Sequence, residues 1–310
     1  VFTAGGAAYH GMGAQLLRAL PEITSPISAN FPLGDVSAWI FTPAHEPLPA
    51  DYLWGTALVS QAHAQLTLGL LGLRPSAAIG YSSGESNVLY AFGVWNDIGA
   101  MRREILETGM LDREIGVEFR AVARAWQVDR ADWAVWNVLA PVDEVRTAIS
   151  GEPRVHLMLI NTDRNVVISG DASACERLVK TFGIQRCRPV GYNLACHVPE
   201  LQAEFHQPWL DIHTRHVTPV DGVRFYSNGV SGAYAVSTQA CAAAITRQAE
   251  TTVDFPATIR AAYDDGVRIF VEHGPSGACT NYIREILSGH DILAVHLDRR
   301  DHNIPQIFDE

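Results

Sequence analysis

The chain has 310 residues, of which 47% are hydrophobic and 18% are charged, and its formal net charge is −11. This length allows a substantial core and predicts one large domain or a domain with a smaller one inserted. The acidic balance argues against nucleic acid as a partner, because phosphate binding needs clustered positive charge. No apolar run approaches the roughly 20 residues of a membrane span, so we expect no membrane association.

The five cysteines show no CxxC spacing, so the sequence predicts neither a disulfide framework nor a metal site. This use of cysteine indicates that the protein works in a reducing compartment, the cytoplasm. The chain opens on VFTAGG, with no initiator Met and no signal-peptide pattern. We therefore interpret it as one domain of a larger multidomain polypeptide.

The first elements predict an α/β arrangement. The opening VFTAGGAAYHGMG followed by AQLLRAL indicates a strand, a glycine-rich loop and a helix. Residues 52–73 have helical spacing and stop before Pro75. The strand SAAIG then leads into YSSGESNVLYAFGVW, which indicates a sharp turn into a buried helix.

The pattern changes over residues 119–189, where short segments predict strand, helix, strand, strand, helix and a final strand. This order is typical of a ferredoxin-like insertion. Helices are predicted around 199–214 and 237–262, and strands at 268–275 and at ILAVHL. We therefore expect an α/β fold, with an α/β-hydrolase-like large subdomain formed by 1–118 and 190–310 and a ferredoxin-like small subdomain at 119–189.

A candidate nucleophile lies in Gly80–Gly84, which fits the G-x-S-x-G pattern around Ser82. Glycines two positions on either side of a serine permit a strained turn from a strand into a helix. The turn places the serine at a helix N-terminus, where free N–H groups and the helix dipole stabilise an oxyanion. The preceding apolar strand and the following helix supply the context that this pattern requires.

The wider segment GYSSGESNVLYAFGVW resembles the GHSxGE elbow of malonyl-CoA:acyl carrier protein transacylases and of the acyltransferase domains of polyketide and fatty acid synthases. Further landmarks are similar to that family in the same order: VFTAGGAAYHGMG, LRPSAAIG, INTDRNVVISG, ACHVPELQ, FYSNGVSG and FVEHGPSGACT. They cover the chain from Phe2 to about Leu287. Among these synthases, the chain resembles most the long iterative polyketide synthases, including the enediyne type, and this resemblance implies a role in antibiotic biosynthesis.

The resemblance implies a catalytic pair of Ser82 and His197, the histidine of the CHVPE segment. A serine hydroxyl needs a base, and the ordinary pKa of histidine suits that task. In the family a main-chain carbonyl orients the histidine, so we expect a dyad without a triad acid. The segment FVEHGP lies where the family runs a strand into the site and where a backbone carbonyl holds the catalytic imidazole, which makes His273 a lesser candidate. The N–H groups of Gly5 and Ser83 would form the oxyanion hole.

Substrate recognition departs from the family. Relatives specific for malonyl groups clamp the free carboxylate with an arginine 25 positions after the serine, and here that position is Glu107. Arg102 lies about one helical turn earlier and is the alternative clamp. Otherwise Asn87, Asn161 and Tyr81 are the candidates for holding the acyl end, and Tyr81 also replaces the family's histidine before the nucleophile.

The implied activity is transfer of a malonyl or other short acyl group from coenzyme A, through acyl-Ser82, to the phosphopantetheine thiol of an acyl carrier protein, with no bound cofactor. We expect malonyl-CoA to be preferred by a modest margin. Neighbouring synthase domains and an acidic carrier protein are the expected partners, with docking at Arg113, Arg120, Arg124, Arg130, Arg186 and Arg188. The alternatives are a serine hydrolase or thioesterase, an acetyl-specific starter-unit transferase, and a non-enzymatic docking domain.

Overall fold

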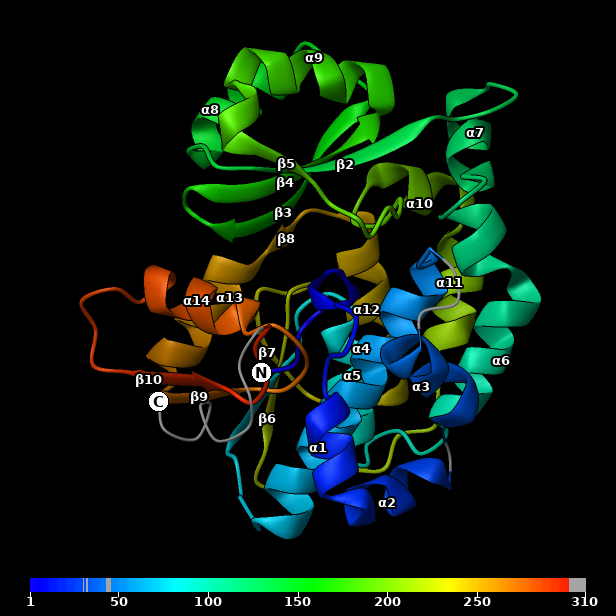
Figure 1. Cartoon of the computed structure of the whole chain (residues 1–310). Helices are drawn as coiled ribbons and strands as arrows, with labels where there is room; N and C mark the ends of the chain where they lie inside the picture. The colour runs from blue at the N-terminus through cyan, green and yellow to red at the C-terminus, as the bar shows by residue number, and fades with distance from the viewer. Residues whose placement is uncertain (30, 32, 43–45, 301–310) are drawn as a thin grey trace.

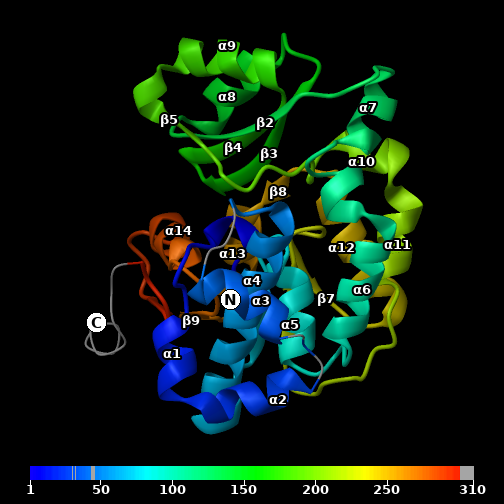
Figure 2. The same ribbon diagram turned by 45° about the vertical axis from the view of Figure 1, so that its right-hand side comes forward.

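The computed structural model describes residues 1–29, 31, 33–42 and 46–300, in two bodies that differ in size (Figure 1). The smaller body, built around β2 to β5, sits on one end of the larger one. The view in Figure 2 shows the same separation, with α8 and α9 on the outer face of the small sheet. The last part of the predicted large subdomain, 301–310, lies outside the described residues.

The centre of the large body is a mostly parallel sheet. β1 (Ala77–Ile79) pairs in parallel with β6 (Arg224–Ser227), and β6 pairs antiparallel with β7 (Gly232–Tyr234). β9 (Ile269–Glu272) pairs in parallel with β10 (Leu293–His296). Phe2, only 1% exposed, bridges both halves through parallel contacts with Gly80 and His273. The opening residues therefore lie in the middle of the sheet.

Helices cover this sheet and carry most of the large core. In chain order they are α1 (Ala14–Ala19), α2 (Thr24–Ser28), α3 (Leu33–Phe41), α4 (Pro49–Ala64), α5 (Gly84–Ala91), α6 (Ile98–Thr108), α7 (Arg120–Trp126), α10 (Pro199–Glu204), α11 (His206–His213), α12 (Thr238–Glu250), α13 (Phe255–Asp264) and α14 (Ala278–Ile286). No helix among the described residues is both long and apolar enough to span a membrane.

The small body has its own sheet and its own core. Its elements are β2 (Trp133–Val138), α8 (Val142–Ile149), β3 (Val155–Thr162), β4 (Asn165–Asp171), α9 (Ala172–Phe182) and β5 (Cys187–Pro189). The sheet order is β5-β2-β4-β3, antiparallel throughout, and β8 (Val253–Asp254) of the large body adds in parallel to β3. The second core, from Val138 to Cys187, packs under α8 and α9.

The α/β class and the ferredoxin-like order of the insertion are confirmed, because the strands and helices follow the predicted sequence. Three predicted helices differ in detail. Residues 52–73 form α4 followed by a π-helical turn at Gln65–Leu70, and 199–214 forms α10 and α11. The third, 237–262, is divided into α12 and α13 by β8, after which Asp254 caps α13 and Pro256 stands in its first turn.

α7 lies inside the range predicted for the insertion but packs on α10, and its buried residues belong to the large core. The second core thus begins only at β2. Residues 119–132 serve as a connection that runs along the large body before the small sheet starts.

Candidate active site

Ser82 stands at a strained turn between β1 and α5. Its φ is 52°, in the left-handed region that non-glycine residues rarely adopt. The flanking glycines are required by space: a Cβ at Gly84 would lie 2.0 Å from the carbonyl oxygen of Phe2, and one at Gly80 would lie 2.3 Å from Cα of Glu85. The chain therefore turns sharply against the central strand line, and Ser82 is presented at the N-terminal end of α5.

His197 faces Ser82 from the segment before α10. Its Nε2 lies 2.7 Å from Ser82 Oγ, and its Nδ1 lies 2.5 Å from the carbonyl oxygen of Gln248 on α12. Because a carbonyl only accepts, Nδ1 carries the proton and Nε2 is left to accept from the serine hydroxyl. Burial lowers the pKa of His197 to about 4, so the ring is neutral near pH 7.

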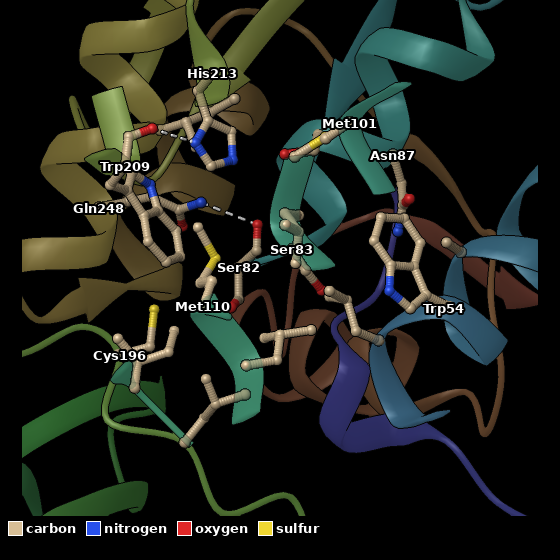
Figure 3. Close-up of a pocket in the computed structure, with 18 of the residues that line it drawn as sticks. Trp54, Ser82, Ser83, Asn87, Met101, Met110, Cys196, Trp209, His213 and Gln248 are labelled. Carbon is tan, nitrogen blue, oxygen red and sulfur yellow. Dashed lines mark hydrogen bonds between the residues drawn. The ribbon is translucent and has the colours of Figure 1, made fainter. Parts of the chain in front are cut away.

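Gln248 ties both members of the pair together. Besides its carbonyl contact with His197, its side-chain Nε2 donates to the carbonyl oxygen of Ser82 at 2.9 Å (Figure 3). The backbone of His197 also donates to the carbonyl of Ala249 at 2.6 Å. Thus α12 sets the position of the imidazole.

A buried carboxyl group fixes the start of α5. Glu85 accepts from Ser227 Oγ at 2.7 Å and from the backbone and side-chain nitrogens of Asn228 at 2.7 and 2.8 Å. Burial raises the pKa of Glu85 to about 7, against the opposing effect of these donors. The contacts join the elbow to the end of β6, so the helix that carries Ser82 cannot shift freely along the sheet.

The candidate oxyanion donors flank Ser82. The N–H of Gly5 donates to Ser83 Oγ at 3.1 Å, and the hydroxyl of Ser83 thus lies next to the place where an oxyanion would form. A Cβ at Gly5 would lie 3.0 Å from Tyr192 Cζ, so the tyrosine ring takes the space that a side chain would need. The backbone of Gly5 therefore contacts Ser83, the residue after Ser82, and its role as an oxyanion donor stays a prediction.

A cavity of about 90 Å³ opens beside Ser82 and His197; we call it the Ser82 pocket (Figure 3). Its apolar wall consists of Leu53, Trp54, Ala57, Ile98, Met101, Ile105, Met110, Leu111, Ile115, Met158, Leu194 and Ile245. The remaining lining residues are Ser82, Ser83, Ser86, Asn87, Tyr90, Tyr192, Cys196, His197, Trp209, His213 and Gln248.

The structure brings only part of the predicted substrate site to this pocket. Asn87, on the first turn of α5 after Ser82, lines it. Tyr81 and Asn161 do not line it: the Tyr81 hydroxyl donates to Asn161 Oδ1, and the Tyr81 ring packs against Phe255 and Tyr282 beneath the elbow. These two residues connect the large and small bodies instead of holding an acyl group.

Arg102 also lies away from the pocket. α6 turns Ile98, Met101 and Ile105 toward the pocket, whereas Arg102 and Arg103 line a separate surface hollow. Glu107 is exposed. The prediction that Arg102 holds a substrate carboxylate is therefore not supported, because the helix phase puts the guanidinium on another face.

Two further sequence expectations need correction. The carbonyl that holds His197 comes from Gln248 and not from the FVEHGP strand. His273 lies within the sheet instead, with its Nε2 2.8 Å from Thr67 Oγ1 and its ring stacked on Phe2. Sequence inspection missed Gln248, since a backbone carbonyl has no side-chain signature. It also missed His213, which no family-like segment marks.

No group of three or more His, Cys, Asp or Glu side chains within the described part of the chain has an arrangement that could hold a metal ion. Within the Ser82 pocket, the contact between Ser82 and the neutral His197 is the arrangement that suits nucleophilic chemistry.

The chain is similar to known proteins in sequence and in fold. No family model matches the chain. It is 27% identical over 252 residues to a polyunsaturated fatty acid synthase of Thraustochytrium sp., covering 74% of this chain and 12% of that protein. It is 29% identical over 286 residues to 5-methyl-1-naphthoate synthase of Streptomyces sahachiroi, covering 88% of this chain and 15% of that protein. The chain thus spans only a small part of the length of these relatives.

Solved structures cover the chain almost completely. A loading acyltransferase from the avermectin modular polyketide synthase aligns with a TM-score of 0.77 at 20% identity, over 99% of this chain and 96% of that one. A malonyl-transacylase in complex with a type II polyketide synthase acyl-carrier protein aligns with a TM-score of 0.79 at 19% identity, over 100% and 98%.

Fold and site together define the class: the chain has the acyltransferase fold, an α/β-hydrolase-like subdomain with a ferredoxin-like one inserted. Its sequence relatives include polyketide synthases, and the resemblance to their acyltransferase domains is confirmed.

Proposed function

We propose that the chain is an acyltransferase that moves a malonyl or other short acyl group from coenzyme A to the phosphopantetheine thiol of an acyl carrier protein. The observation that carries this proposal is the contact of Ser82 Oγ with His197 Nε2 at 2.7 Å, while His197 Nδ1 is held by the Gln248 carbonyl. Donor and product are both thioesters, so no bound cofactor is needed.

In the first half-reaction His197 Nε2 takes the proton of Ser82 as Oγ attacks the thioester carbonyl carbon. The N–H groups of Gly5 and Ser83 stabilise the oxyanion, and the Ser83 hydroxyl gives up its contact with Gly5. The carbon–sulfur bond then breaks, and the coenzyme A sulfur leaves with the proton from His197. The product of this half is acyl-Ser82.

In the second half-reaction the thiol of the carrier's phosphopantetheine gives its proton to His197, and the sulfur attacks the acyl-Ser82 carbonyl. The bond to Oγ breaks, and His197 returns the proton to the serine. A hydrolase would let water take the place of this thiol. Two features favour transfer over hydrolysis. The Ser82 pocket has an apolar wall, and His197 Nδ1 contacts a backbone carbonyl where a hydrolase triad would place a carboxylate.

The chain aligns with only a small part of each of its relatives. This supports the proposal that it acts within a larger multidomain synthase, with neighbouring synthase domains and a carrier protein as partners. We propose the cytoplasm as its location on the basis of its cysteine usage. An enediyne-type host, and antibiotic biosynthesis as its pathway, stay predictions from the sequence resemblance.

Intact-protein mass spectrometry after incubation with a panel of acyl-CoA thioesters tests the function. The expected result is one acyl adduct that Ser82→Ala abolishes and His197→Ala slows at least about a hundredfold, in line with the usual contribution of a general base. The adduct should then pass to added holo carrier protein. Ser173→Ala, at a serine of α9 in the small body, is the matched control and should load normally.

An acyl adduct that persists in Ser82→Ala would refute the assignment of Ser82 as the nucleophile. Adduct loss to free acid, equally fast with or without carrier protein, would identify a hydrolase instead.

A further inference from the structure

The described lining of the Ser82 pocket contains no cation. α6 contributes Ile98, Met101 and Ile105, and the π-helical turn Met110–Glu114 contributes Met110 and Leu111. No Arg or Lys occurs among the described residues that line this pocket. The acyl end would therefore meet methyl, methylene and thioether groups.

The titratable groups in the lining are all uncharged near pH 7. Burial lowers the pKa of His213 to about 4 and raises the pKa of Cys196 to about 12. Burial also raises the pKa of Tyr90 and of Tyr192. The site thus offers a bound carboxylate no compensating charge.

His213 is oriented unfavourably for a carboxylate. Its Nδ1 lies 2.7 Å from the carbonyl oxygen of Trp209, so Nδ1 carries the proton and donates there (Figure 3). Its Nε2 is consequently a lone-pair acceptor, which repels a carboxylate and cannot donate to it. The Asn87 amide could donate from the wall, but a neutral hydrogen bond is about half as strong as a charge-assisted one.

Nearby cations are engaged elsewhere. Arg102 and Arg103 line the hollow on another face of α6. Arg215, close enough to His213 to lower its pKa, forms an ion pair with Glu104. Moving a carboxylate out of water into such surroundings is unfavourable, because no cation in the described lining replaces its lost hydration and only neutral donors, such as the Asn87 amide and the Nε1 groups of Trp54 and Trp209, remain.

The volume of the pocket limits the chain length. An apolar cavity of about 150 Å³ holds benzene. The cavity here, of about 90 Å³, therefore fits about four carbon atoms or fewer. We propose that the Ser82 pocket selects a short uncharged acyl group, such as propionyl or butyryl, over malonyl. This inference rests on the acyl transfer proposed above and reverses the donor preference expected from the family resemblance.

Competition loading tests it: the protein receives equal malonyl-CoA and butyryl-CoA, and the masses of the adducts on Ser82 are compared. We expect butyryl-Ser82 to exceed malonyl-Ser82 at least about tenfold, since the free-energy cost of burying one unpaired charge is larger than the free energy gained from the apolar contacts of a short chain. Malonyl-Ser82 in equal or greater amount would overturn the proposal. Loading of neither donor, nor of any other acyl-CoA, would overturn the acyl transfer itself and this selectivity with it.

Two variants of α6 locate the selectivity. Met101→Arg places a guanidinium in the wall of the pocket, and we expect it to raise the malonyl-to-butyryl ratio at least about tenfold through a charge-assisted contact. Glu107→Arg makes a charge change on the exposed face of the same helix and should leave the ratio unchanged. Ile105→Arg repeats the test at a second pocket position. Unchanged ratios in both pocket variants that still load would overturn the assignment of this wall to the acyl group.

Discussion

The imidazole of His197 is neutral because it is buried, and this has a measurable consequence. Desolvation disfavours the charged form, and the Gln248 carbonyl only partly offsets it, so the pKa lies at about 4 instead of 6.5. A base must be unprotonated to accept the Ser82 proton. The base form is therefore nearly complete above about pH 5 and is lost only as the pH falls through about 4.

We predict that the rate of acyl loading stays constant from pH 8 down to about pH 5 and halves near pH 4. The rate is measured with an uncharged butyryl thioester mimic as the donor, so that no group on the donor titrates over this pH range. Because His63 and His213 are also buried with a pKa of about 4, unfolding takes up protons below pH 6.5 and stability falls there. Circular dichroism at each pH separates this from catalysis. Half-loss near pH 6.5 in folded protein would contradict the assignment.

At the scale of the element, the elbow depends on two glycines, each of which approaches a different neighbour. Gly80 is close to the start of α5, and Gly84 is close to the carbonyl of Phe2 in the centre of the sheet. Neither has a positive φ, so the requirement is space and not backbone conformation. The strand, the turn and the helix can pack only when both Cβ atoms are absent.

Gly84→Ala should therefore destabilise the protein by about 3 kcal/mol, as overpacking of a rigid core does, and should abolish acyl loading because Ser82 is displaced. Gly34→Ala is the matched control: its Cβ would meet nothing within 4 Å on α3, so stability should be unchanged or slightly higher. Thermal unfolding and loading are measured on both. A Gly84→Ala protein that loads normally would show that the elbow can relax.

On the scale of the whole molecule, the proposed function requires a chain with a net charge of −11 to bind a carrier protein that we expect to be acidic. Of the six arginines expected at the docking surface, three are already in ion pairs: Arg120 with Glu118, Arg124 with Glu114 and Glu204, and Arg186 with Glu144. Their charges are largely cancelled. Arg130 and Arg188 are exposed and contribute more positive potential at the border of the small body.

We predict that Arg130→Glu with Arg188→Glu raises the KM for carrier protein about threefold to tenfold and leaves loading from acyl-CoA unchanged, because rim charges act on encounter. The control is Arg74→Glu, which should leave the KM unchanged. Arg74 is exposed and precedes β1, so it lies at the opposite end of that strand from Ser82. Equal losses in loading and transfer would assign the arginines a structural role.

Local sequence determined much of this protein. The glycine spacing around Ser82 predicted the elbow, because only glycine fits where the turn packs against the central strand. The pattern of short segments predicted the order of strands and helices in the small body and part of the order in the large one. The family-like context of His197 singled it out among the 12 histidines, and the structure sets it 2.7 Å from Ser82.

Only the tertiary structure decided what surrounds that pair. Gln248 acts through a backbone carbonyl, which any residue could provide, so no residue type indicated it. α6 packs against α11 and against the π-helical turn Met110–Glu114, and its helical phase places Met101 in the pocket and Arg102 outside it. Tyr81 and Asn161 lie 80 positions apart and are brought together by the packing of the two bodies. A side chain's neighbours depend on how elements pack, and that information is absent from local spacing.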